Sequence, residues 1–579
     1  MRVQRALIFV SLLFKICCCL WPTPKTYEHG SSVCWLSSDF HLILDPVQST
    51  FWDDLPFAVP KCFYRVSLGH GEGGDLINAA FLRLKEAIRA HTFIPWKFYP
   101  NNADFEPESL SQNRLIRSLK VKYRYSLLSS PSKEAYDLSI SEDCNVSLHA
   151  NSPLGVLRAL TTFMQLFYRH SHDVRRLSLP YMNTAPVMVS DAPAFEHRGL
   201  NLDISRNIIP PQDVIRTIDA LALCKFNRLH LHASDAQSWP LEIPSLPELA
   251  AKGAYHSSQV WSVTDLHEVQ QFGADRGVEV YIEMDMPGHT ASVHQSYPEL
   301  ITSFNRKPWE KYSAQPPSGQ LDLNSSAVHA FIETLLSDLL PRTKPFSPLF
   351  HLGGDEITAA AYNMTQTELR PFLRAFVDHA ISIVKAHGLT PLVWEEQVLD
   401  YNLTLPANTV VQAWRGATAS QPRSSLAELV GRGHRALFGS NDYWYLDCGH
   451  GTWIDPKGRD QGPSSGVEDR YVDYCTPYKN FRHILSYDPL VGIPPSQRHL
   501  VVGGEVHLWG ELTDGVSLDT MLWPRVAAAG EVLWRGKGTV GEESTRRLAE
   551  MREWLVGIGV GSGPVQVTWC LMNAGNCVA

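Results

Sequence analysis

Several features that mark common functional classes are missing from this sequence. There is no basic excess: the 579-residue chain carries a formal net charge of −9, whereas nucleic-acid-binding domains are usually basic. No basic cluster suggests a phosphate site, and no glycine-rich segment joins a strand to a helix as dinucleotide sites require. No internal repeat or low-complexity tract is apparent. We therefore expect no nucleic-acid partner and no dinucleotide cofactor.

The sequence also lacks, after its first twenty residues, any stretch long and apolar enough to span a membrane. The N-terminus, "MRVQRALIFVSLLFKICCCLWP", has a basic start at Arg2 and Arg5 followed by a short apolar core. This pattern is typical of a secretory signal peptide, although Lys15 interrupts it and a membrane anchor is the alternative. We predict that residues 1–20 are a signal peptide and that the protein is secreted, with a vacuolar or lysosome-like compartment as the other destination.

Cysteine is scarce but even in number outside that segment. Three of the eleven cysteines fall within it, which leaves eight: Cys34, Cys62, Cys144, Cys224, Cys448, Cys475, Cys570 and Cys577. An even count in a secreted chain permits disulfides without fixing their pairing. Candidate glycosylation sites are marked by N-x-S/T sequons at Asn145, Asn324, Asn363 and Asn402.

The length of the chain indicates more than one domain, and residues 21–185 have the pattern of a small α/β domain. The segment "AYDLSIS" (135–141) alternates like a half-buried strand. The segment "GVLRALTTFMQLF" (155–167) places its apolar residues on one helical face. We interpret this part as an accessory scaffold domain without chemistry of its own.

From about residue 190 the pattern changes to short apolar runs, mostly separated by segments of helix length. There are eight such runs: "HRGLNLDIS" (197–205), "NRLHLHASD" (227–235), "VEVYIEMD" (278–285), "PLFHLGGDE" (348–356), "TPLVWEE" (390–396), "TVVQAW" (409–414), "HRALFGS" (434–440) and "VVGGEVHLWGE" (501–511). Eight strands alternating with helices predict a parallel (β/α)8 TIM barrel over residues 186–560. Residues 561–579 would form a C-terminal tail with a cysteine pair, and 441–480 is the clearest long loop.

Most of these runs end in groups able to do chemistry. The acids at or beyond the strand ends are Asp203, Asp235, Asp285, Asp355, Glu356, Glu395, Glu396 and Glu511. Active sites of TIM barrels lie at the carboxyl ends of the strands, and acids after nearly every strand are hard to explain as helix caps alone. Aromatic residues gather at the same ends, among them Trp394, Trp414, Tyr445, Trp453 and Trp509. Aromatic faces interleaved with carboxylates suit a sugar ligand.

The adjacent acids Asp355 and Glu356 raise two alternatives. Many glycosidases place two carboxylates across the scissile bond, but successive side chains of an extended segment point to opposite faces. A metal site is the other reading, in which His351 and these acids are joined by ligands from other strand ends: His232, Asp235 and His289. An aromatic lining would be unusual around a metal-bound water, so we interpret the histidines as partners that orient carboxylates.

The segment "FHLGGDE" (350–356) resembles the signature of the family 20 glycoside hydrolases, the β-N-acetylhexosaminidases. Further segments resemble that family, in the family's order: "HRGLNLDISRN" (197–207), "LHLHASDAQSWPL" (230–241), "YIEMDMPGHT" (281–290), "WEE" (394–396), "VQAW" (411–414), "WYLDCG" (444–449) and "GGEVHLWGE" (503–511). The resemblance extends to the accessory domain and covers nearly the whole mature chain. The tail "TWCLMNAGNC" (568–577) is most similar to secreted fungal members.

The resemblance implies a substrate-assisted mechanism, in which the sugar's own 2-acetamido oxygen attacks the anomeric carbon. Glu356 would be the general acid and then the base. Asp355 would hold the acetamido N–H and stabilise developing positive charge. Tyr445 would donate a hydrogen bond to the acetamido carbonyl oxygen. The two adjacent acids would thus serve different parts of one sugar.

The resemblance also implies contacts for the rest of that sugar. Arg198 would bind its 3- and 4-hydroxyls, and Asp447 and Glu511 its 4- and 6-hydroxyls. Trp453 would be a platform near the mouth of the site. The indoles that would wall in the acetamide methyl and the ring are Trp394, Trp414 and Trp509. The residues of the supporting network would be Asp235, Asp285, His289 and His351.

The implied disulfides are Cys448–Cys475, which would clamp the loop carrying Tyr445, and Cys570–Cys577. No metal or organic cofactor is implied. Relatives often form homodimers through the barrel, which no stretch here demonstrates.

We therefore predict a retaining exo-β-N-acetylhexosaminidase that acts on oligosaccharides ending in β-linked GlcNAc or GalNAc, from chitooligosaccharides or glycoconjugates. A metal-dependent barrel hydrolase is the first competing hypothesis. A catalytically inactive sugar-binding protein is the second, and the intact set of Asp355, Glu356 and Tyr445 argues against it.

Overall fold

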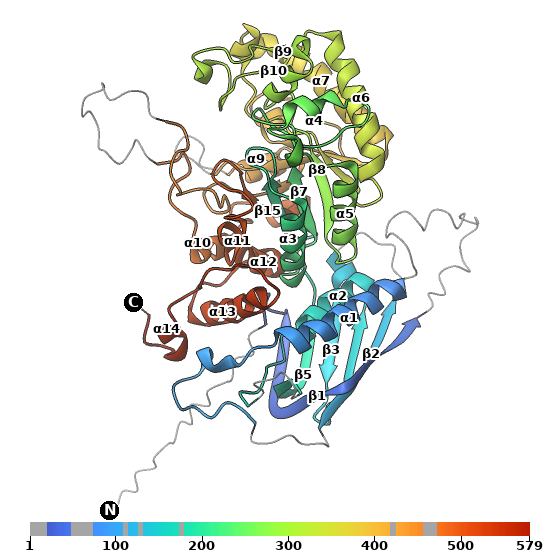
Figure 1. Cartoon of the computed structure of the whole chain (residues 1–579), viewed down its shortest axis with the longest axis vertical. Coiled ribbons are helices and arrows are strands. Elements are labelled where there is room, and N and C mark those ends of the chain that lie inside the picture. The colour runs from blue at the N-terminus through green and yellow to red at the C-terminus, as the bar shows by residue number, and fades with distance from the viewer. Residues whose placement is uncertain are drawn as a thin grey trace, which may run out of the picture.

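The computed structural model describes residues 20–47, 73–107, 114–124, 131–172, 179–416, 424–455 and 472–578. They form two parts, an N-terminal α/β domain and a barrel (Figure 1). The expected signal peptide, apart from its last residue, and Cys62 lie outside the described residues.

The N-terminal domain is built on a five-stranded sheet in the order β1-β2-β4-β3-β5. The long strand β1 closes this sheet, because one part of it pairs with β2 and another part with β5. The strands are β1 (Thr26–Val47), β2 (Leu115–Arg124), β3 (Tyr136–Ile140), β4 (Val146–Ala150) and β5 (Tyr181–Asp191). The strand expected at 135–141 is β3. Since β5 runs to Asp191, the sheet extends beyond the domain boundary expected at residue 185.

Two helices, α1 (Gly73–His91) and α2 (Pro153–Met164), lie between this sheet and the barrel (Figure 1). The helix expected at 155–167 is α2. It begins where the Ser152 side chain accepts hydrogen bonds from the amides of Leu154 and Gly155, with proline at the first helical position.

The second part is a closed barrel of eight parallel strands, in the order β11-β12-β13-β14-β15-β6-β7-β8. All eight strands expected from the sequence are present: β6 (His197–Asp203), β7 (Arg228–His232), β8 (Glu279–Glu283), β11 (Leu349–His351), β12 (Thr390–Trp394), β13 (Val410–Ala413), β14 (Arg435–Phe438) and β15 (Val501–Leu508). Strands of a parallel barrel are covered on both faces, which explains why they are rich in apolar residues, although in β6 and β7 these alternate with buried polar residues such as Asn201 and His230. The fold is a TIM barrel.

Helices surround the barrel and extend beyond it. They are α3 (Pro211–Leu223), α4 (Glu248–Gly253), α5 (Val263–Ala274), α6 (Ser326–Thr343), α7 (Gln366–Ala386), α8 (Glu396–Leu399), α9 (Ser425–Gly431), α10 (Phe481–Leu485), α11 (Leu518–Leu522), α12 (Arg525–Arg535), α13 (Glu542–Gly557) and α14 (Thr568–Met572). Within the described ranges, none of the helices has the length and apolarity needed to cross a membrane.

Buried ion pairs join the two domains. Glu134 of the N-terminal domain pairs with Arg198 of β6 at 2.6 Å, and Arg158 of its own domain, in α2, also lies 2.6 Å from it. Lys225 of the barrel reaches Asp191 of β5 at 3.0 Å, with both side chains fully buried. Because an unpaired charge in such a place is costly, these pairs favour one docked arrangement of the domains.

The structure contains three disulfides among the described cysteines: Cys34–Cys144, Cys448–Cys475 and Cys570–Cys577. The last two are the pairs that the family resemblance implies. Cys224 is a buried free thiol. The four sequon asparagines, Asn145, Asn324, Asn363 and Asn402, are all exposed.

Candidate active site

The turn after β11 separates the two adjacent acids. Gly353 and Gly354 have φ angles of +68° and +96°, and Glu356 itself has φ +49°. A side chain at Gly353 would overlap the carboxylate of Asp285, so glycine is required there. The turn leaves the Asp355 side chain 14 % exposed and the Glu356 side chain 33 % exposed. Left-handed backbone at a non-glycine residue costs energy and clusters at functional sites.

Glu356 is in contact with a chain of buried charged groups. Its Oε2 lies 3.3 Å from Nε2 of His289, and Nδ1 of His289 lies 3.1 Å from Asp235. Asp235 in turn lies 2.8 Å from both His232 and Arg206. Although burial opposes charge on the imidazole, the charges of Asp235 and Asp355 raise the pKa of His289 well above its ordinary value. His289 is therefore a cation held against the carboxyl group of Glu356.

Asp355 lies 4.0 Å from the same nitrogen of His289 and close to a further acid, Asp285. Burial, and then the charge of Asp355, raise the pKa of Asp285 well above its ordinary value. Burial likewise raises the pKa of Asp355, although the charge of His289 opposes this effect. Asp285 also accepts from the amide of Gly354 at 2.8 Å, which ties the glycine turn to β8. Both acids thus face Nε2 of His289, Glu356 at 3.3 Å and Asp355 at 4.0 Å, and Asp355 lies beside Asp285 as well.

Aromatic side chains form a cluster at the same end of the barrel. It contains Trp394, Tyr445 and Trp509, together with the Cys448–Cys475 disulfide, and Trp414 packs against it. The rings of Trp414 and Tyr445 are stacked with centroids 6.1 Å apart. Trp394 and Trp509 lie 6.2 Å apart. We call this group the aromatic cluster; the disulfide anchors the segment that supplies Tyr445, as expected.

A second polar group adjoins Trp509. The group consists of Asp447 and Glu511. The backbone amide of Trp509 donates to Asp447 at 3.5 Å, and the side chain of Gln315 donates to Glu511 at 2.8 Å. Burial, and then the nearby charge of Glu511, raise the pKa of Asp447 to about 8. At neutral pH Asp447 can therefore donate a hydrogen bond, while Glu511 accepts. The guanidinium of Arg206 lies 5.0 Å above the Trp509 ring.

The expectation that Arg198 binds the sugar is wrong. Arg198 is the second residue of β6 and lies at the amino-terminal end of the barrel, 1 % exposed. Its guanidinium donates to Glu134 and to the backbone carbonyls of Lys225 and Phe195. The hydrogen bonds to Glu134 cross to the N-terminal domain, and those to Phe195 and Lys225 hold the guanidinium at the amino-terminal end of the barrel.

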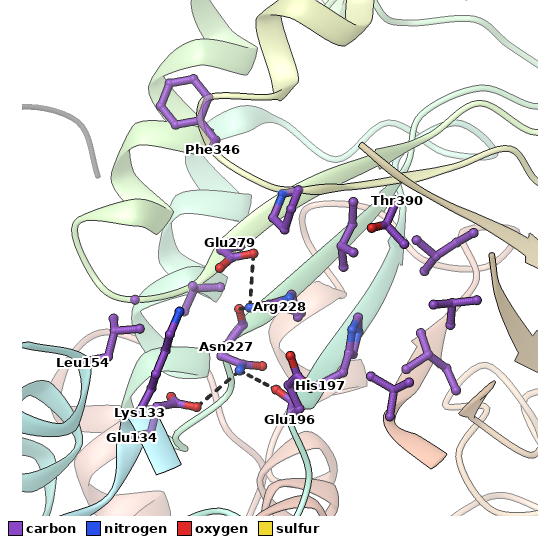
Figure 2. A pocket seen from close by; sticks show the side chains of 18 of the residues that line it. Lys133, Glu134, Leu154, Glu196, His197, Asn227, Arg228, Glu279, Phe346 and Thr390 are labelled. Atoms are coloured by element: carbon purple, nitrogen blue, oxygen red, sulfur yellow. Dashed lines mark hydrogen bonds and ion pairs between the residues drawn. The ribbon is translucent and has the colours of Figure 1, made fainter. Parts of the chain in front are cut away.

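A cavity of about 380 Å³ lies at this amino-terminal end. Figure 2 shows Asn227 between Glu134 and Glu196, and Arg228 paired with Glu279 at 3.3 Å. Many of its lining residues are the first residues of barrel strands. Since TIM-barrel chemistry occurs at the opposite end, this cavity is not the candidate active site.

The arginine at the active-site end is Arg206, which the sequence interpretation did not single out. It follows β6, pairs with Asp203 at 3.2 Å and Asp235 at 2.8 Å, and faces Gln315. Burial lowers the pKa of Arg206, but the combined charges of Asp235, Asp203 and Glu511 outweigh it, so that the pKa lies above its ordinary value. Arg198 and Arg206 both lie in "HRGLNLDISRN". The expected strand could have distinguished them, because only Arg206 lies beyond its carboxyl end, where the active site of a TIM barrel is found.

The structure also describes the positions of two other expected site residues, His351 and Trp453. His351 does not contact Asp355 or Glu356; it lies 3.1 Å from Glu283, the last residue of β8. Its support of the site would therefore pass through Glu283. Trp453 is 37 % exposed, and its role as a platform stays a prediction.

Comparisons with known proteins agree with this geometry. The model of the "Glycosyl hydrolase family 20, catalytic domain" matches residues 195–537, and a model described as "beta-acetyl hexosaminidase like" matches residues 20–166. The chain belongs to glycosyl hydrolase family 20. Its enzyme class is that of the β-N-acetylhexosaminidases.

Individual family 20 relatives span nearly the whole chain. A β-hexosaminidase of Arthroderma benhamiae is 42 % identical, covering 96 % of this chain and 97 % of its own. A chitooligosaccharidolytic β-N-acetylglucosaminidase of Bombyx mori is 30 % identical over 88 % of this chain and 84 % of its own. The solved β-N-acetylhexosaminidase of Streptomyces coelicolor has a TM-score of 0.67 at 21 % identity, covering 94 % of this chain and 97 % of its own, and supports the fold.

The two arginines of this family 20 enzyme should differ in what they affect. Arg198→Met breaks a buried pair and should destabilise the fold by about 3 kcal/mol, with KM for an aryl β-GlcNAc unchanged. Arg206→Lys removes donors from the active-site end and should raise KM by about tenfold or more, since hydrogen bonds to charged groups contribute about 1.5–3 kcal/mol. Thermal unfolding and steady-state kinetics on both variants check this. A raised KM in folded Arg198→Met would contradict the assignment.

The raised pKa of Asp447 should make the stability of the enzyme depend on pH. Between about pH 4 and the folded pKa of about 8, the native carboxyl group keeps a proton that the unfolded chain has lost. Stability therefore falls as pH rises through this window. Asp447→Asn removes the effect, so its Tm relative to the native enzyme should rise by a few degrees between about pH 5 and about pH 8. A constant difference in Tm across this range would mean that Asp447 ionises normally.

Proposed function

We propose that this family 20 enzyme is a retaining exo-β-N-acetylhexosaminidase that uses the substrate's 2-acetamido group as nucleophile. The observation that supports this most directly is the different placement of the adjacent acids: Glu356 is the more exposed and lies 3.3 Å from His289, whereas Asp355 is more buried and lies beside Asp285. An acid with a proton-transfer role and an acid with an electrostatic role need such different surroundings.

In the first step, the acetamido carbonyl oxygen forms a bond to the anomeric carbon while the glycosidic C–O bond breaks. Glu356 gives its proton to the leaving oxygen. Positive charge develops on the oxazolinium ring, and Asp355 accepts from its N–H and stabilises that charge. The hydroxyl of Tyr445 donates to the attacking oxygen and positions it.

In the second step, a water molecule takes the place of the leaving group. Glu356, now a carboxylate, accepts a proton from the water while the water oxygen bonds to the anomeric carbon. The carbon–oxygen bond of the oxazolinium ring breaks and the acetamido group is restored. Two displacements at the same carbon retain its configuration.

The remaining residues bind the terminal sugar. Trp394, Trp414 and Trp509 of the aromatic cluster would enclose the acetamide methyl and the sugar ring. Asp447 and Glu511 would take its 4- and 6-hydroxyls, one as donor and one as acceptor. Arg206 replaces Arg198 as the cation for the 3- and 4-hydroxyls, because it lies at the correct end of the barrel.

We propose chitooligosaccharides or glycoconjugates ending in β-GlcNAc or β-GalNAc as substrates, and an extracellular or lysosome-like location. The name of the Bombyx mori relative supports the first of these substrate classes. Hydrolysis of matched aryl β-GlcNAc, β-GalNAc and β-glucoside substrates tests the function. The two amino sugars should be cleaved and the glucoside, which lacks the nucleophile, barely touched. Comparable cleavage of the glucoside would exclude the substrate-assisted mechanism.

Removal of metal ions should leave the activity unchanged. The groups that could hold an ion include His289, Asp355 and Glu356, as well as Asp235, Asp285 and His289. Both ring nitrogens of His289 already have carboxylate partners, Asp235 at Nδ1 (3.1 Å) and Glu356 at Nε2 (3.3 Å), and a zinc ion would have to displace both contacts. We expect full activity after dialysis against EDTA. Loss of activity that zinc restores would favour the metal-dependent hydrolase instead.

A further inference from the structure

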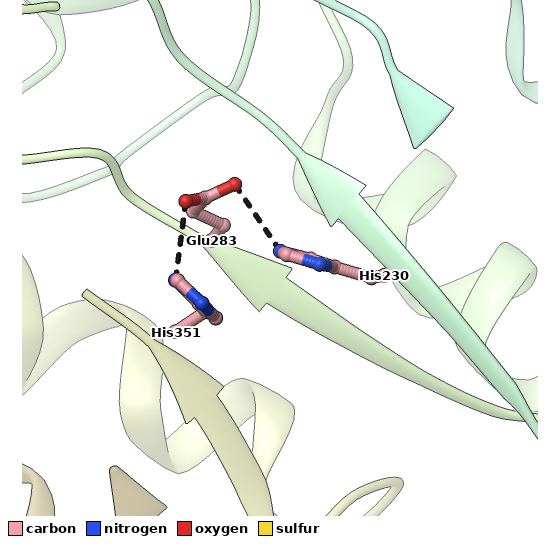
Figure 3. Close-up of side chains that lie close together, drawn as sticks. All are labelled: His230, Glu283 and His351. Carbon is pink, nitrogen blue, oxygen red and sulfur yellow. Dashed lines mark ion pairs between the residues drawn. The ribbon is translucent and has the colours of Figure 1, made fainter. Parts of the chain in front are cut away.

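Glu283 occupies a central place in the barrel interior that the mechanism above does not use. It is the last residue of β8 and is fully buried. Its Oε1 accepts from the indole of Trp394 at 2.7 Å and faces His351 at 3.1 Å. Its Oε2 faces His232 at 2.6 Å and His230 at 3.2 Å. Figure 3 shows this carboxylate between the imidazoles of His230 and His351.

One side of Glu283 leads to the general acid. Nδ1 of His232 faces Glu283, and its Nε2 faces Asp235 at 2.8 Å. Asp235 then contacts His289, which contacts Glu356. An ionised carboxylate can only accept hydrogen bonds, so an imidazole facing a carboxylate at each nitrogen carries both protons. The orientation of His289 against Glu356 therefore depends on Asp235, and that of Asp235 on the His232–Glu283 contact.

The charges along this chain alternate. Although burial opposes it, the charge of Glu283 and the hydrogen bond to Asp235 raise the pKa of His232 well above its ordinary value. The surrounding histidines hold the pKa of Glu283 well below its ordinary value, against the effect of burial. Each ion thus stabilises the next, and removal of one charge disturbs the geometry of its neighbours.

The other side of Glu283 leads to the aromatic cluster. The indole N–H of Trp394 donates to Oε1, and this bond limits rotation of the ring about its side-chain axis. The ring of Trp394 lies 6.2 Å from that of Trp509 and belongs to the cluster that includes Tyr445. A change in the position of the carboxylate would therefore tilt one wall of that cluster.

The trio His230, Glu283 and His351 also has the composition of a metal site. The two imidazole rings, however, are stacked, with centroids 4.9 Å apart and planes only 28° from parallel. Imidazole lone pairs lie in the ring plane, so rings stacked in this way do not direct them at one point. Both Glu283 oxygens already accept from Trp394 and His232. The geometry favours a hydrogen-bonded hub.

We propose that Glu283 is a positioning residue that fixes the position of the general acid, Glu356, relative to the acetamido-binding wall formed by Trp394. This inference rests on the roles proposed above for Glu356 and Trp394. It makes one buried carboxylate responsible for two properties that are measured separately: proton donation to the leaving group and affinity for the acetamido-derived ring.

Glu283→Gln tests the proposal, because it keeps the shape of the side chain and removes its charge. With chitobiose, whose sugar leaving group needs full protonation, kcat/KM should fall by about 100-fold or more; general acids contribute about 10²–10⁴-fold. With an activated aryl β-GlcNAc the loss should be at least tenfold smaller. Affinity for a thiazoline mimic of the oxazolinium ion should fall as well, by about tenfold. Equal losses on both substrates with unchanged thiazoline affinity would overturn the proposal.

Two further variants separate the two sides. His232→Gln interrupts the path to Glu356 and leaves the Glu283–Trp394 bond in place, so we expect the leaving-group effect; because the His232 ring also packs edge-on against Trp509, thiazoline affinity should fall less than in Glu283→Gln. Trp394→Phe removes the indole donor together with part of the ring that faces the aromatic cluster, so we expect weaker thiazoline binding without a leaving-group effect. Combined with Glu283→Gln, each should be strongly non-additive, because the paired residues share one interaction. Additive losses would mean that Glu283 acts independently of both.

Glu531→Gln is the matched control. Glu531 of α12 is a buried carboxylate that accepts from Thr23 and pairs with Arg547, away from this chain. Its loss should lower stability without a leaving-group effect. If Glu283→Gln does not fold, Glu283→Asp replaces it, because it keeps the charge but withdraws the carboxylate by one methylene. This variant should show a smaller leaving-group effect and a smaller loss of thiazoline affinity. A folded Glu283→Asp variant with neither effect would contradict the proposal. If Glu356→Gln loses rate equally on chitobiose and on the aryl substrate, the proposed function itself is contradicted. If Glu356→Gln shows the leaving-group effect and Glu283→Gln does not, only the inference about Glu283 is contradicted.

Discussion

Glu356→Gln should nearly abolish hydrolysis of chitobiose while leaving substrate binding largely intact. Loss of a general acid typically costs about 10²–10⁴-fold, because an alkoxide leaving group must otherwise depart unprotonated. An activated aryl leaving group needs less protonation, so its glycosylation step should suffer much less. Pre-steady-state kinetics on both substrates measure that step directly.

The Glu356 prediction has a defined failure. If both substrate types lose rate equally in the glycosylation step, Glu356 is not the acid. Glu531→Gln again serves as control, since it removes a buried carboxyl charge away from the site. Exogenous azide should restore activity of Glu356→Gln with the activated substrate by attacking the intermediate without base assistance.

Asp355→Asn should have the second large effect, a fall in kcat of about 10²–10³-fold for every substrate with a 2-acetamido group. The substitution keeps the size of the side chain but removes the negative charge that faces the developing positive one. It also replaces an acceptor by an amide that faces Asp285. Affinity for the thiazoline mimic should fall in parallel, as expected for a residue that acts on the intermediate. Tyr445→Phe should show the same pattern more mildly.

The alternative for Asp355 is direct nucleophilic attack. Intact mass spectrometry after incubation with a 2-deoxy-2-fluoro or 5-fluoro sugar distinguishes the two mechanisms. A covalent glycosyl adduct on Asp355 would make it a nucleophile, and the substrate-assisted mechanism would have to be abandoned. No adduct, together with strong thiazoline inhibition, is the expected result.

The sequence by itself determined the barrel and the location of its active end. The eight strands were readable because strands buried on both faces are rich in apolar residues, as in β8 with Val280, Tyr281 and Ile282. Acids follow those runs, and parallel strands bring their carboxyl ends to one edge. The adjacent pair Asp355 and Glu356 was therefore predictable as a site. The disulfides Cys448–Cys475 and Cys570–Cys577, expected from the resemblance, join cysteines only 27 and 7 residues apart.

Only the tertiary structure decided which of the polar residues share a site. Arg198 and Arg206 stand in one motif, yet the length of β6 carries them to opposite ends of the barrel. Cys34 forms a disulfide with Cys144, 110 residues away in sequence. Glu283 accepts a hydrogen bond from Trp394, 111 residues away. The reason is that local periodicity reports only which face of its own element a residue occupies. Contacts such as Glu283 with Trp394 arise when strands distant in sequence close into a barrel, and nothing in either segment alone encodes that meeting.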